Sequence, residues 1–173
     1  MVDACQECGY GYDNPVEAIA GTLRSLGSDY GERLRRTDGD ALRTQPAPSV
    51  WSGLDYACHV RDVVLIQRER ILLALVESCP SFAPMYREQR VELADYQAHS
   101  PDEVADQIVL AAELCATVLA GLGQEQWARP SIYNFPVPTE RDVAWLGRHT
   151  LHEGVHHLGD IDRGIADIMS PAP

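Results

Sequence analysis

Four segments of this chain carry the pattern that begins an α-helix. In each, a side chain that can cap the first turn is followed by an acidic residue that faces the positive end of the helix dipole. The segments are Asn14-Pro15-Val16-Glu17, Ser52-Gly53-Leu54-Asp55, Ser100-Pro101-Asp102-Glu103 and Thr139-Glu140-Arg141-Asp142. Because each opens a stretch in which apolar residues recur every three or four positions, the chain is constrained to a few long helices.

The extent of these stretches predicts the architecture. Helices are expected over residues 15–37, 52–78, 101–121 and 140–167. The connections at 79–99 and 122–138 are long, part of 86–96 is expected to form a short helix, and no segment shows the sustained alternation of a β-strand. We therefore predict an all-α fold, a four-helix bundle with long crossover connections over residues 15–169, preceded by a cysteine-containing segment, 1–14.

The composition narrows the class of protein. The 14 basic residues are all arginine and stand against 26 acidic ones, which gives a formal net charge of −12. This balance argues against nucleic-acid and anionic membrane partners, which need clustered positive charge. No apolar run approaches the roughly 20 residues that span a bilayer, and the start of the chain lacks a signal-peptide pattern, so we expect a cytoplasmic protein. The use of arginine alone is typical of a high-GC bacterial genome.

Four of the six histidines lie within residues 149–157. On a helix, His149, His152 and His156 share one face, whereas His157 points elsewhere. Two imidazoles one turn apart commonly bind one metal, and His59 on the second helix can supply a third ligand. Three protein ligands with one open position are typical of catalytic zinc. A solvated histidine cluster is the alternative.

Two further residues could support this site. Asp160 continues the histidine face, where it either orients the ring of His156 or is an exposed acid. Tyr133 and Asn134 precede the last helix, and they either line the mouth of a pocket or belong to a loop fixed by its prolines.

The same helix allows a peptidase interpretation. His152-Glu153-Gly154-Val155-His156 matches H-E-x-x-H, and with Gly159 and Asp162 the segment is similar to the metzincin pattern of zinc proteases. That resemblance implies that Glu153 acts as the general base on a zinc-bound water. The helices predicted upstream disagree with it, because metzincins place a sheet before the motif.

A second resemblance covers most of the chain. The segment Trp51-Ser52-Gly53-Leu54-Asp55-Tyr56-Ala57-Cys58-His59 resembles the W-S-x-x-[DE]-x-x-x-H opening of the second helix in the DinB/YfiT-like superfamily. Members of that family carry H-x-x-x-H, or E-x-x-x-H in mycothiol-dependent members, on a helix near the C-terminus. In this sequence His152 and His156 match that motif. The resemblance therefore implies a bundle that binds zinc, with nickel or iron as alternatives, through His59, His152 and His156. Glu153 is not assigned to the metal-facing side.

The resemblance also implies a chemistry. Related enzymes include mycothiol-dependent maleylpyruvate isomerase and bacillithiol or mycothiol S-transferases, in which a metal-bound thiolate attacks an electrophilic small molecule. We therefore expect a metal-dependent thiol S-transferase or thiol-dependent isomerase, with mycothiol favoured as co-substrate by the arginine-only composition. A non-catalytic, stress-associated metal-binding protein is the alternative. The resemblance makes a homodimer plausible.

The N-terminal segment departs from the family pattern. Cys5-Gln6-Glu7-Cys8-Gly9 is a C-x-x-C-G knuckle without a second C-x-x-C in the sequence. Cys5 and Cys8 could form a second metal site with Cys58 or Cys79, act as a redox pair, reach the bundle metal, or have no chemical role.

Overall fold

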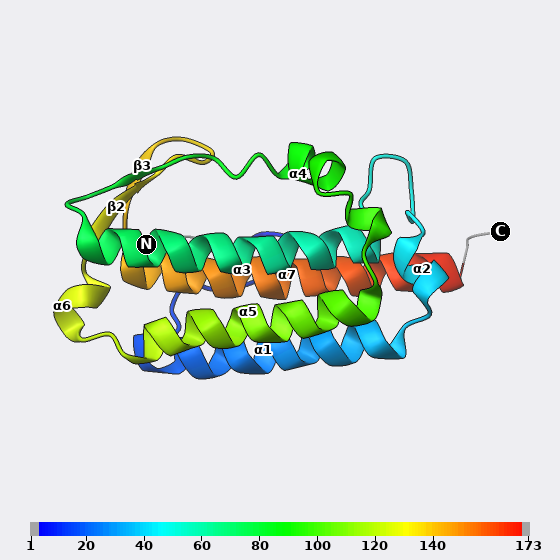
Figure 1. Ribbon diagram of the computed structural model, residues 1–173, viewed down its shortest axis with the longest axis horizontal. Helices are drawn as coiled ribbons and strands as arrows, with labels where there is room; N and C mark the ends of the chain where they lie inside the picture. Colours follow the sequence, from blue (N-terminus) through cyan, green and yellow to red (C-terminus); the bar gives the residue numbers. More distant parts are fainter. Residues whose placement is uncertain (1–3, 171–173) are drawn as a thin grey trace.

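Four long helices dominate the computed structural model, which describes residues 4–170 (Figure 1). They are α1 (Val16–Arg36), α3 (Gly53–Val76), α5 (Pro101–Ala120) and α7 (Val143–Met169). Shorter helical elements lie in the connections: α2 (Gly39–Arg43), α4 (Arg87–Leu93), the 3-10 turn η1 (Tyr96–Ala98) and α6 (Gln124–Trp127). The predicted fold class, an all-α four-helix bundle, is confirmed, and the expected short helix within 86–96 is α4.

The order of the helices in space explains the long connections. Helix α1 packs against α5 and α7, and α3 packs against the same two helices. Helices α1 and α3, and likewise α5 and α7, therefore lie on diagonals of the bundle, whereas α3 and α5 are neighbours (Figure 1). The connections from α1 to α3 and from α5 to α7 cross an end of the bundle. The connection from α3 to α5 returns along the length of the bundle, because these two helices run in the same direction (Figure 1).

The predicted helix starts differ in how the structure uses them. At α3 the prediction is accurate: the Ser52 side chain accepts a hydrogen bond from the backbone N–H of Asp55, and the Asp55 side chain accepts one from that of Ser52. At α7 the predicted start is wrong. Thr139 begins a strand, and Asp142 caps the helix instead by accepting a hydrogen bond of 2.7 Å from the backbone N–H of Trp145.

A small sheet also departs from the prediction of no strands. It contains β1 (Ser81–Phe82), β2 (Pro130–Tyr133) and β3 (Thr139–Asp142), with β1 parallel and β3 antiparallel to β2. These strands are too short for alternation to be visible in the sequence. They form because the two long connections meet at one end of the bundle, where their backbones pair (Figure 1).

A glycine allows α1 to approach α7 closely. A Cβ atom at Gly154 would lie 2.2 Å from Cδ2 of Leu26, so a larger residue could not occupy this position without a shift. Beside this contact, the buried Tyr30 hydroxyl donates a hydrogen bond of 2.8 Å to the Gly154 carbonyl. Helix α1 thereby supports α7 at the level of its histidines.

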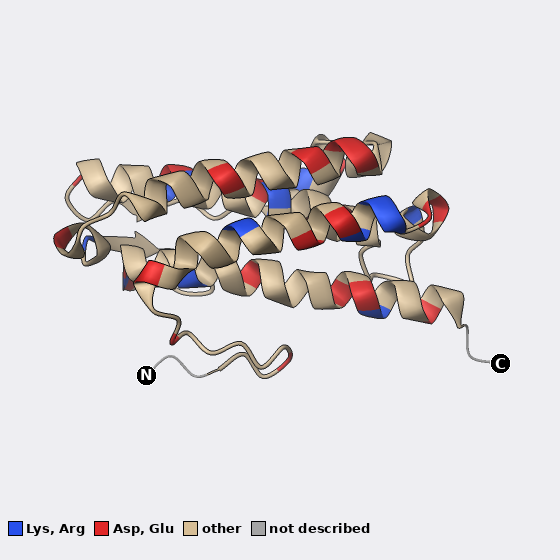
Figure 2. Cartoon of the chain, turned by 90° about the horizontal axis from the view of Figure 1, so that it is seen from below, with Lys and Arg blue, Asp and Glu red and all other residues tan. Residues whose placement is uncertain are grey.

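Acidic and arginine residues are spread over the helices, and the N-terminal segment lies beside α7, outside the four helices (Figure 2). None of the helices within residues 4–170 is long and apolar enough to cross a membrane.

Candidate metal centre

Helix α7 carries metal-binding side chains on two neighbouring stripes. Residues four apart share a stripe. His149, Glu153 and His157 therefore form one stripe, and His152 and His156 form the next. The packing of the helix decides which stripe faces inward. Its buried residues include Val143, Gly147, Thr150, Gly154, His157 and Ile161. The stripe with Glu153 and His157 therefore lies toward the bundle interior, where α3 supplies a further side chain.

That side chain is His59, and with Glu153 and His157 it forms what we call the inner donor group. The Nε2 atoms of His59 and His157 lie 3.8 and 3.7 Å from the same atom, Oε2 of Glu153. These separations are too long for hydrogen bonds. They are close to the roughly 3.4 Å expected between two ligands that each bond a tetrahedral zinc at about 2.0–2.1 Å.

Asp160 holds the His157 ring in the orientation that metal binding requires. His157 Nδ1 lies 2.7 Å from Oδ2 of Asp160 and donates a proton there, while Nε2 faces Glu153. Burial opposes protonation of this ring, but Asp160 and Glu153 outweigh it and raise the pKa of His157 to about 8, so a metal would bind at Nε2 in exchange for a proton. The sequence left open whether Asp160 orients His156 or is an exposed acid. The distance from Asp160 Oδ2 to His156 Nε2 is 3.6 Å, so the hydrogen bond is made to His157 instead.

The electrostatics of the inner donor group suit a cation. Burial opposes ionisation of Glu153, but the imidazoles of His152, His157 and His59 outweigh it and hold the pKa of this carboxyl well below its usual range. Burial lowers the pKa of His59, which keeps its ring neutral and able to bind a metal. His59 Nδ1 is buried without a hydrogen-bond partner among the described residues. A carboxylate and two imidazoles thus fit a divalent metal of the zinc type.

A cavity of about 360 Å³ adjoins the inner donor group. His59 and Glu153 line it, together with residues of α3, of the segment before α4 and of the β2–β3 connection. Gln67 is 1% exposed, lines the cavity, and has both side-chain amide atoms without hydrogen-bond partners in the described chain. Arg70 lies beside it, with Nη1 3.4 Å from the Tyr133 hydroxyl.

His149 forms a wall of this cavity between two tyrosines. Its Nδ1 lies 3.1 Å from the hydroxyl of Tyr12, and its Nε2 lies 3.1 Å from that of Tyr133. Burial lowers the pKa of His149 to about 4, so the ring is neutral, with one nitrogen donating and the other accepting. Asn134 also lines the cavity, and its Nδ2 donates to Ser81 Oγ and to the Phe82 carbonyl, which fastens β1 to β2.

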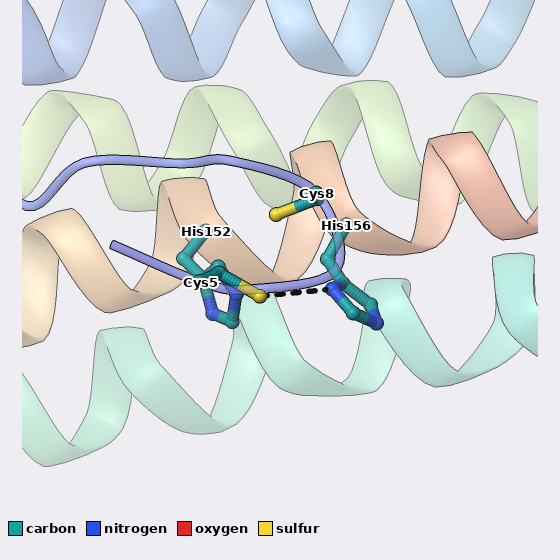
Figure 3. Close-up of side chains that lie close together, drawn as sticks. All are labelled: Cys5, Cys8, His152 and His156. Carbon is teal, nitrogen blue, oxygen red and sulfur yellow. Dashed lines mark hydrogen bonds between the residues drawn. The ribbon is translucent and has the colours of Figure 1, made fainter. Parts of the chain in front are cut away.

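The remaining predicted ligands lie on the other stripe of α7. His152 and His156 lie with Cys5 and Cys8, in what we call the outer donor group, and all four ligand atoms are within 4.8 Å of one another (Figure 3). Cys5 Sγ is 3.6 Å from His156 Nδ1. A hydrogen bond from the backbone N–H of Cys8 is the main cause that lowers the pKa of the Cys5 thiol to about 6, with contributions from His152 and His156.

The structure therefore groups the ligands differently from the set inferred from the sequence, and the groups overlap: His152 also lies close to Glu153, and His156 lies close to His157. It does not bring His59 together with His152 and His156, and it places Glu153 and His157 beside His59 instead. One signal could have located this pair: the apolar spacing along α7 puts His157 on the buried side of the helix. Neither Cys58 nor Cys79 joins Cys5 and Cys8 in a donor group within residues 4–170.

A family model described as the DinB superfamily matches residues 22–161. The chain belongs to the DinB superfamily. Among curated protein sequences, none matches this DinB protein.

Solved structures show the same fold at low sequence identity. YfiT from Bacillus subtilis, described as a probable metal-dependent hydrolase with an unusual four-helix bundle topology, is 16% identical, with a TM-score of 0.80 over 98% of this chain and 91% of that one. The mycothiol-dependent maleylpyruvate isomerase is also 16% identical, with a TM-score of 0.67 over 88% of this chain and 67% of that one. A mutant of that isomerase gives a TM-score of 0.66 at 15% identity over the same shares of the two chains.

Proposed function

We propose that this DinB protein is a metal-dependent enzyme that uses a low-molecular-weight thiol, mycothiol in particular, to attack an electrophilic small molecule. The reaction is either a thiol S-transfer or a thiol-dependent isomerisation. One observation carries the proposal: three protein ligands converge beside a cavity that two of them, His59 and Glu153, line, so the cavity side of a bound metal would be left for substrate. Zinc is the expected metal, with nickel or iron as alternatives.

The charges of the inner donor group favour a thiolate. His59, Glu153 and His157 would hold the metal, and the bound ion would lower the pKa of a coordinating thiol, so that the thiolate exists at neutral pH. Two neutral imidazoles and one carboxylate offset only one of the two positive charges of the ion. The group therefore prefers an anionic ligand to a neutral one, and Asp160 keeps His157 in the tautomer that this requires.

The cavity supplies contacts for the electrophile. The unpaired amide of Gln67 can bind a carbonyl or hydroxyl group, and the guanidinium of Arg70 can bind a carboxylate. In S-transfer, a carbon–sulfur bond forms while the leaving group departs with its bonding electrons, and the thiol proton passes to solvent. In isomerisation, the same carbon–sulfur bond forms and then breaks.

Two further observations support this choice over the other chemistries. One structural neighbour is named as a mycothiol-dependent isomerase, which favours a thiol, and the other, described as a probable metal-dependent hydrolase, supports the metal alone. The arginine-only composition is typical of the high-GC genomes in which mycothiol occurs. The peptidase interpretation is less well supported, because His152 and His156 do not line the cavity, whereas Glu153 does.

The test uses untagged protein loaded separately with zinc, nickel or iron(II). Each form is mixed with monochlorobimane and mycothiol, bacillithiol or glutathione, and conjugate formation is followed by fluorescence. We expect turnover with mycothiol and at least one metal, and loss of turnover in Glu153→Gln. Glu125→Gln removes the same charge at an exposed position of α6 and is the matched control.

Other outcomes would contradict the proposal in specific ways. A bound metal at the inner donor group without turnover for any thiol and several electrophiles would indicate a non-catalytic metal-binding protein. Hydrolysis of casein or peptides without a thiol, abolished in Glu153→Gln, would indicate a peptidase.

A further inference from the structure

We propose that Cys5, Cys8, His152 and His156 form a second, structural zinc site that fastens the N-terminal segment to α7. The ligand spacings are those of structural zinc sites: a C-x-x-C pair on a tight turn and an H-x-x-x-H pair one helical turn apart. The four ligand atoms lie within 4.8 Å of one another before any metal is considered (Figure 3). The proposal does not depend on the function of the inner donor group.

The cysteine pair is shaped by a local turn. The backbone N–H of Gly9 donates 2.9 Å to the carbonyl of Cys5, and that of Cys5 donates 2.9 Å to the carbonyl of Tyr10. Gly9 has a φ of +72°, which favours glycine and lets the chain reverse at this point. Figure 3 shows the resulting loop with both cysteines beside the two histidines of α7. The sequence Cys5–Gly9 is therefore built as a ligand-bearing knuckle.

His152 gives an independent indication of a missing partner. Both of its ring nitrogens are buried and make no hydrogen bond among the described residues, although Nδ1 lies 3.4 Å from Oε1 of Glu153. The nitrogen Nε2 has neither a hydrogen bond nor an ion pair among these residues. The rings of Tyr10 and Tyr12 pack against the imidazole, with centroids 5.6 and 5.5 Å away, and separate it from solvent. Leaving such an imidazole unpaired costs about 1–3 kcal/mol, and a metal bond to one of its nitrogens removes part of that cost.

The chemistry of the four ligands selects zinc and a closed site. Two thiolates and two neutral imidazoles exactly offset the charge of a divalent ion, and soft sulfur ligands exclude magnesium, calcium and manganese. Four protein ligands leave no position for a substrate, so the site is structural and not catalytic. The carboxylate of Glu7, 3.3 Å from His156 Nε2, is placed to orient that ring while Nδ1 faces Cys5.

Fastening the N-terminal segment to α7 also affects the cavity. The N-terminal segment that carries the knuckle also carries Tyr12, whose hydroxyl contacts Nδ1 of the cavity-lining His149 at 3.1 Å. Zinc at the outer donor group therefore holds Tyr12 against the side of His149 that faces away from the cavity.

The experiment compares metal content and cobalt spectra. Untagged protein, purified under reducing conditions and reconstituted with zinc, is measured by inductively coupled plasma mass spectrometry. We expect the Cys5→Ser/Cys8→Ser variant to bind about one zinc fewer per chain than the unchanged protein. Cys79→Ser, a partly buried cysteine outside the group, is the matched control and should lose none. Circular dichroism verifies that each variant is folded.

Cobalt(II) in place of zinc identifies the ligands. We expect a thiolate-to-cobalt charge-transfer band in the unchanged protein and in His59→Ala, and its absence in Cys5→Ser/Cys8→Ser. Equal zinc content in the unchanged and double-cysteine proteins would overturn the proposal, as would a cobalt complex without that band. Retention of a weaker band in Cys8→His would support it, since Cys5 still supplies one thiolate and a histidine can replace the other.

Discussion

The inner and outer donor groups occupy neighbouring stripes of the same helix, yet they are completed by different partners. The inner group takes its third ligand from α3 and adjoins a cavity, whereas the outer group takes two thiols from the N-terminal segment and is covered by tyrosine rings. Repeats of four residues in a helix therefore specify a pair of ligands, but not the site to which the pair belongs. The element that packs on each stripe decides whether a bound metal is open to substrate or enclosed.

Separate substitutions of two adjacent histidines, His156 and His157, test most directly whether the two donor groups are distinct, and they have the largest expected effect. His157→Ala should lower metal occupancy of the inner group and thiol-transfer activity by more than about 100-fold, because even partners of metal ligands contribute about 10–100-fold. His156→Ala should instead weaken cobalt binding at the outer group, so that the thiolate-to-cobalt band needs more cobalt to develop, and should retain the inner metal. If His156→Ala removes the inner metal and His157→Ala does not, the ligand set inferred from sequence is correct and the division into two groups is wrong.

A second prediction concerns the carboxylate behind the inner group. Asp160→Asn should weaken zinc binding at the inner group by about 10–100-fold, because His157 loses its charged acceptor. The outer group should change less, since Asp160 lies 3.6 Å from His156 Nε2. Competition with a chromophoric chelator measures both affinities, and Asp167→Asn, an exposed change on the same helix, is the control. Equal weakening of both groups would show that they are not separate.

A third prediction affects both groups together. Gly154→Ala introduces a Cβ that meets Leu26, so we expect a net loss of about 1–2 kcal/mol in the free energy of unfolding, after the gain in helix propensity. Gly21→Ala on α1 meets no atom within 4 Å and should be neutral or stabilising. Urea denaturation with metals bound gives both values. A stable Gly154→Ala protein with unchanged metal affinities would mean that α1 does not position α7.

The smallest effect is expected where the two regions touch. Tyr12→Phe removes the hydroxyl that contacts His149, and should cost about 0.5–1.5 kcal/mol in the free energy of unfolding. Tyr86→Phe, at a side chain 63% exposed, is the control and should have no effect. The Tyr12→Phe cost should shrink in Cys5→Ser/Cys8→Ser, because Tyr12 is then no longer held in place. If Tyr12→Phe lowers the free energy of unfolding equally with and without the two cysteines, then the outer donor group does not hold Tyr12 against His149.

Sequence predicted the bundle because its signals are local. The cap at Ser52 and the proline at the first position of α5 act within one turn, so they can be read without knowing the neighbours. The start of α7 was misplaced because Thr139 and Asp142 both fit a capping pattern. Only the pairing of β3 with β2, which takes up the residues from Thr139 to Asp142 directly before the helix, distinguishes them.

The site was less predictable because it depends on the rotation of α7. Both His152/His156 and Glu153/His157 satisfy a spacing of four, and the choice between them follows from which side of the helix is packed. The Gln67 amide gave no signal, since a glutamine within a helix is ordinary until its surroundings are seen to leave it unpaired. The knuckle at Cys5 and Cys8 was visible, but its histidine partners are more than 140 residues away in the chain.

Leu26 fits against Gly154 on a third side of α7, in addition to the sides that face α3 and the N-terminal segment. A bundle helix fixed by apolar packing alone retains some freedom to turn about its own axis as neighbouring side chains change rotamer. Here the closeness of α1 removes that freedom, because any turn drives the Leu26 methyl into the helix backbone. The rotation of α7 about its axis is thus fixed by Leu26 and by the missing side chain at Gly154. This rotation sets the direction in which the ligands of both donor groups point.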